Sequence, residues 1–228
     1  MEKEQLKKIA KFFEVLGLEN IRGKYILEKL KKEVQNKLQE KERLLEELKK
    51  ECLNCKKCEL HKTRNNVVFG EGDINTPLMF VGEAPGEQED LEGRPFVGRA
   101  GKLLTTILNQ FGIDRNKIYI ANVLKCRPPN NRDPKPEEIK ACFPYLKKQI
   151  EIIKPKVILC LGAFAARTIL NLPEKTPISK IRGKEFFSEE FKAYVIPTYH
   201  PAFLLRQKRG QEAFREDLKK ALKLAGMI

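Results

Sequence analysis

The residues best suited to chemistry in this sequence are cysteines. Cys52, Cys55 and Cys58 are spaced C-x2-C-x2-C, and Cys126 and Cys142 lie in "KCRPP" and "KACFP". Two thiolates from the first cluster, together with Cys126 and Cys142, would form a four-thiolate site that suits Zn²⁺ or an iron-sulphur cluster. Both metals accept soft sulphur ligands, so the ligand type does not choose between them.

Other residues near these cysteines are expected to have no ligand role. A bacterial ferredoxin run would need a fourth cysteine at the position of Lys62, so the sequence does not match that pattern. Cys160 lies inside the apolar run "VILCLG" and is expected to be a buried thiol. Cys52 is expected to be a spare thiol at the end of the N-terminal helix, with substitution for a neighbouring ligand as the alternative. His61 is expected at the surface, with a Cys3His zinc site as the alternative.

Three loops combine glycine, polar and charged residues directly after short apolar runs. They are "GEAPGEQED" (82 to 90), "NVLKCRPPNNR" (122 to 132) and "TYHPAFLLR" (198 to 206). In an open parallel sheet, ligands bind where loops leave the carboxyl ends of the strands. We therefore expect these loops to meet at one site, where Gly82 and Gly86 let the backbone approach a ligand closely.

The elements that would position these loops follow from the hydrophobic pattern. Continuous apolar runs that alternate with helical stretches predict a parallel sheet covered on both faces, which is an α/β three-layer sandwich. The predicted strands are 77 to 82, 118 to 123, 156 to 162 and 193 to 198. The predicted helices are 99 to 111, 135 to 153, 162 to 171 and 210 to 225.

The first part of the chain differs from the rest, because it is dense in Lys and Glu and almost free of Gly and Pro. We expect a helical N-terminal extension over residues 1 to 50 and a second domain over 51 to 228. Apolar spacing predicts one helix that ends at Gly17 and a second over 25 to 50. Lysines interrupt the heptad pattern, so a helical hairpin packed on the body or on a partner is favoured over a two-stranded coiled coil.

The bulk composition narrows the class of protein. The 228 residues include 45 basic and 31 acidic side chains, a formal net charge of +14, which favours a polyanionic partner such as nucleic acid. No apolar run approaches the roughly 18 residues of a membrane helix. The N-terminus "MEKEQLKKIAKFF" lacks a signal-peptide core, so we expect a cytoplasmic protein whose six cysteines form no disulphide framework.

Four ordered motifs, together with the cysteine spacing, resemble the family 4 uracil-DNA glycosylases, the iron-sulphur type. The motifs are "VVFGEGD", "VGEAPGEQEDLEGRPFVGRAGKLL", "IYIANVLKCRPPNNRDPKPEEIKAC" and "HPAFLL". The resemblance covers about residues 52 to 222, whereas residues 1 to 50 have no counterpart in the family. It implies a four-stranded parallel sheet between helices and a structural [4Fe-4S] cluster. The implied cluster ligands are Cys55, Cys58, Cys126 and Cys142.

The activity implied by the resemblance is a step of base excision repair in single- or double-stranded DNA. A monomeric enzyme would flip uracil out of the DNA, hydrolyse its N-glycosidic bond and leave an abasic site. It would be monofunctional, since the motifs position no lysine as a Schiff-base nucleophile. One alternative is a non-catalytic, metal-stapled nucleic-acid-binding module. Another is a polymerase-associated interaction protein, in which the N-terminal helices bind a protein partner.

The resemblance also implies roles for individual residues in a base pocket. The backbone of Glu83 and Ala84 would lie at the uracil edge and near the catalytic water. Phe96 would stack on the base. Asn122 would select uracil, because an amide offers both a donor and an acceptor. His200 would donate a hydrogen bond to uracil O2 as negative charge develops on the departing base.

The group that activates the water is left open by the sequence. Ala84 stands where other uracil-DNA glycosylases carry Asp or Asn. Glu89 is the first candidate for the role, with Glu83 and Asp90 as alternatives. The structural alternative is that the acidic residues of this loop cap the following turn or pair with nearby arginines.

Residues at the loop tips are expected to contact DNA. Leu204 or Leu205 would fill the gap left by the flipped base, with packing of the following helix as the alternative. Basic side chains would bind phosphates and make DNA binding salt-dependent. These side chains are Arg127, Arg132 and Arg206, together with Lys125, Lys208 and Arg209. Asn131 would lie either in the pocket or at a phosphate.

Overall fold

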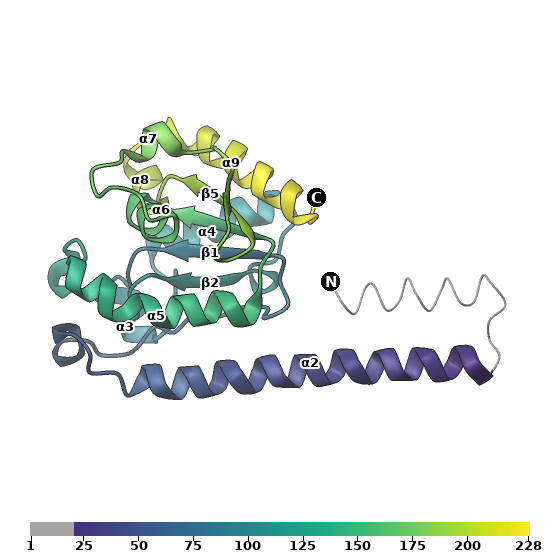
Figure 1. Cartoon of the computed structure of the whole chain (residues 1–228). Helices are drawn as coiled ribbons and strands as arrows, with labels where there is room; N and C mark the ends of the chain where they lie inside the picture. The colour runs from purple at the N-terminus through teal and green to yellow at the C-terminus, as the bar shows by residue number, and fades with distance from the viewer. Residues whose placement is uncertain (1–20) are drawn as a thin grey trace. The chain divides into compact units, whose positions relative to one another are not determined.

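The structure, a computed structural model, describes residues 21 to 228 (Figure 1). The chain divides into two compact units, Met1–Glu47 and Leu48–Ile228. A long helix, α2 (Ile21–Leu53), begins in the first unit and ends in the second. It confirms the second predicted helix, whereas the helix predicted before Gly17 lies outside the described residues.

The second unit is built around a five-stranded sheet in the order β2-β1-β3-β5-β4. Its strands are β1 (Leu78–Gly82), β2 (Tyr119–Asn122), β3 (Val157–Leu161), β4 (Phe186–Ser188) and β5 (Ala193–Thr198). Four of them are parallel, which confirms the predicted parallel strands. The fifth, β4, pairs antiparallel with β5 at the edge. The sequence pattern missed β4 because its three residues are only partly buried and form no long apolar run.

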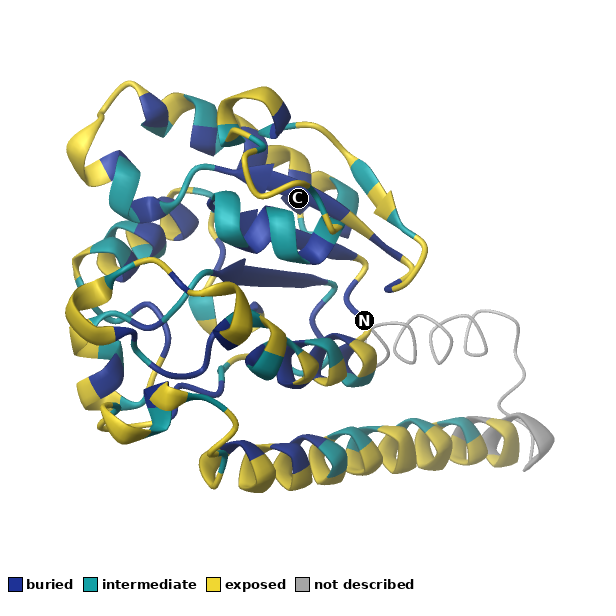
Figure 2. Ribbon diagram, turned by 60° about the vertical axis from the view of Figure 1, so that its left-hand side comes forward, coloured by how far each residue is buried: buried dark blue, intermediate teal, exposed yellow. Residues whose placement is uncertain are grey.

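Helices cover both faces of this sheet, whose central strands are buried throughout (Figure 2). The four long helices of this unit are α4 (Arg99–Gln110), α5 (Pro136–Ile153), α6 (Ala163–Leu170) and α9 (Gly210–Ala225), each within one residue of its predicted bounds. Leu78 and Phe80 of β1 belong to one apolar core with α4 and α9. The intervening residues point to the opposite face, where α5 and α6 lie (Figure 1).

The strand order creates a crevice between β1 and β3 at the carboxyl edge of the sheet. The chain leaves β1 through α4 to reach β2 on one side, and it then returns through α5 to β3 on the other side. Connections that diverge in this way leave a ligand-binding crevice beyond the strand ends. The register places Gly82 beside Asn122 and Leu161 beside Thr198, so the loops that follow these strands start at the same level.

Short helices that the sequence pattern did not predict lie between the longer elements. They are α3 (Glu87–Glu92), α7 (Ile178–Ile181), α8 (Pro201–Arg206) and the 3-10 turns Glu59–Lys62, Arg115–Lys117 and Pro129–Asn131. Segments of this length are too short to show a helical period. Among the described residues, no helix is long and apolar enough to cross a membrane.

Candidate active site

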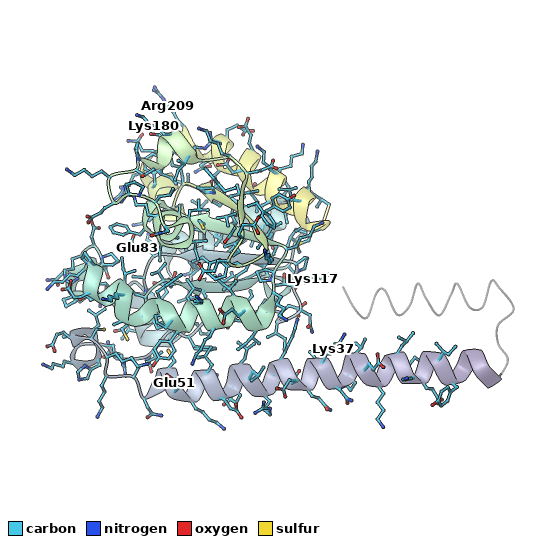
Figure 3. All side chains as sticks on the ribbon, in the orientation of Figure 1. Lys37, Glu51, Glu83, Lys117, Lys180 and Arg209 are labelled. Carbon is cyan, nitrogen blue, oxygen red and sulfur yellow. The ribbon has the colours of Figure 1, made fainter. Side chains whose placement is uncertain are left out.

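A pocket of about 530 Å³ opens at the carboxyl edge of the sheet, a size that suits a nucleotide-sized ligand. Figure 3 shows Glu83 at this edge and Lys117 at the opposite one. The pocket is lined by Glu83, Ala84, Pro85, Gly86, Glu89, Phe96, Ala100, Asn122, Pro128, Asn131, Arg132, Asp133, His200, Ala202, Phe203 and Arg206. The fold therefore brings together all the residues that the sequence assigned to a base pocket, and it also places Asn131 there.

Phe96 forms one wall of the pocket and has an uncommon backbone conformation. Its φ is 51°, in the left-handed region that bulky side chains rarely adopt. The backbone of Gly101 lies so close that a Cβ there would overlap the Phe96 carbonyl. The Phe96 ring centroid is 5.7 Å from that of His200, so the two rings border the same space.

Asn122 lines this pocket with a buried amide. It is the last residue of β2 and only 1% exposed. Its Oδ1 atom has no hydrogen-bond partner within residues 21 to 228. Leaving a buried polar atom unpaired costs about 1–3 kcal/mol, so such atoms are rare in folded proteins. The Asn122 oxygen is therefore left to accept a hydrogen bond from a polar group in this pocket.

His200 is held by its position at the start of α8. Its Nδ1 atom accepts a hydrogen bond from the Ala202 N–H at 3.2 Å, which caps the helix. Because Nδ1 is the acceptor, the ring proton of the neutral imidazole is on Nε2. Burial lowers the pKa of His200 to about 4. The ring is therefore a neutral N–H donor at physiological pH, and Gly162 gives it room, since a Cβ there would lie 3.1 Å from the His200 Cβ.

Two acidic residues of α3, which follows β1, hold the backbone in place. Glu89 accepts hydrogen bonds from the backbone N–H groups of Gly86, Val97 and Gly98 at 3.1, 2.9 and 2.8 Å. Asp90 is buried, and its carboxylate accepts hydrogen bonds from the backbone N–H groups of Asn65 and Asn66. These contacts favour the structural alternative for Glu89 and Asp90 over water activation. They also tie the loop after β1 to the segment that carries Phe96.

Glu83 is the acidic residue of this loop that remains suited to proton transfer. It lines the pocket directly after β1. Burial raises the pKa of Glu83 to about 7, and the negative charge of Asp133 adds to this shift. A carboxyl group with a pKa near neutrality can both accept and release a proton at physiological pH. Ala84, beside it, adds only a methyl group to the pocket wall.

Five cysteines line a second cavity, separate from the first. They are Cys52, Cys55, Cys58, Cys126 and Cys142. Cys52 lies in the last turn of α2 and is buried beside this cavity, so its role as a spare thiol or as a substitute ligand stays a prediction. Cys160 is fully buried in β3, as expected. Within residues 21 to 228, no three Cys, His, Asp or Glu side chains are close enough to hold a single metal ion.

The surroundings of these cysteines suit metal-bound thiolates. The Arg64 guanidinium donates to Cys126 Sγ at 3.1 Å, and the Lys125 backbone N–H donates to Cys142 Sγ at 3.2 Å. Hydrogen bonds to the ligand sulphurs are a common way in which proteins tune an iron-sulphur cluster. Burial raises the pKa of Cys142 to about 12, so a bound metal is needed to keep its thiolate at neutral pH.

Two of the predicted DNA contacts are wrong. Leu204 is 0% exposed and packs in the core with α9, because the helix α8 turns it inward. Leu205, at 41% exposed, is the leucine that reaches the surface. Lys125 is also buried, and its ammonium donates to the Asn122 carbonyl at 2.9 Å and to Gln149 Oε1 at 2.6 Å.

Two of the predicted arginines lie at the pocket. Arg206 and Arg132 line it directly. Arg132 also forms an ion pair of 2.6 Å with the buried Glu138. Arg127 donates to Asn131 at 2.8 Å and lies 3.8 Å from Glu87. Arg206 and Arg132 are therefore placed to bind a phosphate next to the pocket.

Comparisons with known proteins agree with these features. A family model described as "Uracil DNA glycosylase superfamily" matches residues 69–223. The type-4 uracil-DNA glycosylase of Archaeoglobus fulgidus is 50% identical over 80% of this chain and 94% of its own length. Those of Sulfurisphaera tokodaii and Thermotoga maritima are each 49% identical over 79% of this chain, with 84% and 94% of their lengths covered. The chain belongs to the type-4 uracil-DNA glycosylases. The resemblance read from the four motifs is therefore confirmed.

In this member of the type-4 family, sequence reasoning missed several residues that shape the pocket. Gly162 and Gly101 provide close approaches for His200 and Phe96. Asp133 lines the pocket, and its negative charge helps to raise the pKa of Glu83. Arg115 donates to the Phe96 carbonyl from outside the predicted loops. The left-handed conformation and the close approaches leave no periodic signal, and only the glycines themselves hint at them.

Gly82 offers a direct test of the pocket of this type-4 glycosylase. A Cβ at this position would overlap Asn122 Oδ1 and lie 2.6 Å from Phe96 Cζ. We expect Gly82→Ala to slow uracil release by about 100-fold, the cost of displacing a reacting group by about 1 Å. Single-turnover kinetics would measure this loss. Gly112→Asn is the control, because no atom lies within 4 Å of a Cβ there and asparagine tolerates the left-handed φ of 69° at this position. Equal rates for Gly82→Ala and Gly112→Asn would contradict the pocket geometry.

Proposed function

We propose that this chain hydrolyses the N-glycosidic bond between uracil and deoxyribose in DNA, so that free uracil leaves and an abasic site remains. Membership of the type-4 family supports this reaction. The observation that carries its assignment to the described pocket is the buried Oδ1 of Asn122, which lacks a partner among the described residues. The formal net charge of +14 favours binding to a phosphate backbone.

Recognition begins when the target nucleotide leaves the base stack. The uracil enters with one face on Phe96 and its Watson-Crick edge toward Asn122. The amide of Asn122 pairs with uracil O4 and N3–H, whereas the edge of cytosine has the opposite order of donor and acceptor. Leu205 is the exposed leucine of α8 that can occupy the gap in the duplex, and Arg206 follows it at the pocket.

Bond cleavage places negative charge on the departing base. As the bond between C1′ and N1 breaks, its electron pair stays with uracil, and charge collects on N1 and O2 of the ring. The neutral His200 donates its Nε2–H to O2, and this hydrogen bond strengthens as the charge grows. A fixed, partly buried donor needs little reorganisation when the charge appears, which lowers the barrier.

Water completes the reaction at the sugar. The water oxygen forms a bond to C1′ of the cationic sugar and loses one proton. We assign acceptance of this proton to the Glu83 carboxylate, since Glu89 and Asp90 are already bound to backbone N–H groups. The proton can then pass to bulk water or to the released uracil anion, so that the charges balance.

The role of Glu83 predicts a specific pH dependence. The pKa of Glu83 is raised to about 7, so below this pH the carboxyl group is protonated and cannot accept the proton from water. We expect the single-turnover rate to increase as the pH rises through about 7 and then to level off. In Glu83→Gln this pH dependence disappears together with most of the rate. Glu92→Gln, at an exposed position of α3, should keep the wild-type profile. A wild-type profile in Glu83→Gln would contradict the assignment.

We assign a [4Fe-4S] cluster to the cysteine cavity, with Cys55, Cys58, Cys126 and Cys142 as its ligands. The N–H donors at Cys126 and Cys142 support bound thiolates. Each thiolate of such a cluster binds its own iron, so the ligands need not converge as around one zinc ion. When bound, the cluster would link the segment after α2 to the loop after β2 and to α5.

Metal analysis tests this cluster. We expect about four iron atoms and four sulphides per chain in the wild type, as for one [4Fe-4S] cluster. Cys126→Ala and Cys142→Ala should lose the iron and its visible absorption, together with stability. Cys160→Ala should keep the iron, because Cys160 is buried in β3 away from the cavity. One zinc per chain without iron would overturn the cluster assignment.

The proposed reaction is tested by incubating the purified chain with an oligonucleotide that contains one uracil. Free uracil should appear in solution, and alkali should cleave the strand at the former uracil. Oligonucleotides with cytosine or thymine at the same position should stay intact. The proposal fails if neither single- nor double-stranded substrate loses uracil.

A further inference from the structure

Arg115 makes an unusual set of contacts next to the base pocket. It lies in the 3-10 turn Arg115–Lys117, just before β2, and its side chain is 14% exposed. Its guanidinium donates to the carbonyl of Phe96 at 2.8 Å and also to the carbonyl of Pro95. One planar side chain therefore holds two consecutive carbonyl groups of the turn that carries the Phe96 ring.

This turn needs an external support. Phe96 has a φ of 51°, a left-handed conformation that is unfavourable for a bulky side chain and persists only where the surroundings fix it. Gly101 leaves space for the Phe96 carbonyl but makes no side-chain contact with it. The guanidinium of Arg115 binds the carbonyl groups of Pro95 and Phe96, which flank the N–Cα bond whose rotation φ describes. It therefore holds both groups in the orientation that this φ requires.

Glu71 connects this support to the strand that carries Asn122. Its carboxylate accepts a hydrogen bond from Arg115 at 3.0 Å. Arg94 donates two further hydrogen bonds to the same carboxylate, at 2.8 and 3.1 Å. The backbone of Glu71 exchanges two hydrogen bonds with Ile120 of β2, at 3.0 and 2.8 Å. Ile120 lies two residues before Asn122. The contacts therefore form one continuous path from the Phe96 turn to the base-reading strand.

We propose that Arg115, held by Glu71, is a positioning residue that fixes the Phe96 ring relative to Asn122 and so sets the width of the base pocket. This inference rests on the proposed uracil-DNA glycosylase function and adds a specific determinant to it. Arg115 does not touch the base. It acts through the backbone of Phe96, so its loss loosens the surface on which uracil stacks while Asn122, His200 and the phosphate contacts stay in place.

A double-mutant cycle separates this role from a general effect on folding. Arg115→Ala is expected to slow single-turnover uracil release by up to about 100-fold, as for a displacement of about 1 Å. In a Phe96→Ala background the same change should cost no more than about 2-fold, within the error of additivity. Equal losses in both backgrounds would show that Arg115 does not act through Phe96. In both backgrounds, Arg115→Ala should leave the affinity for undamaged DNA unchanged.

Lys117→Ala is the matched control, because Lys117 is an exposed basic residue of the same 3-10 turn and lies at the opposite edge from Glu83 (Figure 3). It should keep the wild-type rate. Arg115→Lys should recover part of the activity, since one ammonium can reach one of the two carbonyl groups. If Arg115→Ala does not fold, Glu71→Gln takes its place in the cycle, because it removes the charge that orients Arg115.

Hydrogen exchange provides a readout that does not depend on catalysis. The backbone amides of Val97 and Gly98 are bonded to Glu89 in the wild type, directly after the supported turn. Their protection should fall in Arg115→Ala and stay at the wild-type level in Lys117→Ala. Unchanged protection in Arg115→Ala would overturn the inference. Absence of uracil release by the wild type would instead reject the proposed function, and the exchange experiment keeps the two failures distinct.

Discussion

Replacement of His200 by serine is expected to reduce kcat for uracil release by about 10² to 10³-fold, the usual cost of removing one donor to a developing anion. Serine can keep the cap at the start of α8, because its hydroxyl accepts the Ala202 N–H as Nδ1 does now. The substitution therefore removes the Nε2–H donor while α8 stays in place. Affinity for the uracil-containing DNA should change little, since the lost hydrogen bond matters mainly in the transition state.

Rapid mixing under single-turnover conditions would measure this effect on bond cleavage itself. Thermal unfolding of His200→Ser, compared with the wild type, shows whether the cap is retained. Lys175→Ser is a suitable control, because Lys175 is exposed and lines neither the base pocket nor the cysteine cavity. A His200→Ser enzyme that cleaves at the wild-type rate would contradict the role of the imidazole.

Asn122→Asp is expected to have the second large effect, this time on base selection. The carboxylate has nearly the shape of the amide but lacks the donor that uracil O4 requires. Loss of one such pair is worth about 1–3 kcal/mol of discrimination between bases. We expect a matching fall in the rate on uracil, and the ratio of uracil to cytosine release should shift toward cytosine, whose amino group can donate to a carboxylate.

Competition between uracil and cytosine oligonucleotides would measure this ratio. Asn131→Asp provides the comparison, because Asn131 also lines the pocket but belongs to the turn after β2 and bonds to Arg127. It should leave the ratio unchanged. An unchanged ratio in Asn122→Asp would remove Asn122 from base recognition and leave its unpaired buried oxygen without an explanation.

Most of the fold could be predicted because its strands and long helices follow simple physical patterns. The buried strands are continuous apolar runs, and the covering helices show the helical period, so both were located to within about one residue. The edge strand β4 and the helix α8 were missed, since three and six residues are too few to show a period. The α8 helix then explains the wrong prediction for Leu204, which the helix turns into the core.

The candidate site could be predicted in part, because motif residues directly after strands meet at one edge of a parallel sheet. Phe96, Asn122 and His200 line one pocket for this reason. The support provided by Arg115 was not predictable, because hydrogen bonds to backbone carbonyl groups leave no pattern in the sequence. Lys125 was assigned to phosphates from its charge alone, whereas the fold buries it behind Asn122.

The acidic loop after β1 has a mainly structural explanation. Glu89 and Asp90 bind backbone N–H groups, so their charges stabilise the backbone around the pocket. Glu83 is left at the pocket with a raised pKa. This segment therefore carries two carboxylates that bind backbone N–H groups and one carboxyl group suited to proton transfer, within an otherwise basic protein.

The most direct measurement is a crystal structure of the protein with DNA that contains one uracil nucleotide stabilised against cleavage by a 2′-fluoro group. The uracil should lie outside the base stack, with its face on Phe96, its O4 and N3 at the Asn122 amide and its O2 at His200 Nε2. A uracil that stays stacked in the DNA, or that binds away from these three residues, would contradict the proposed site.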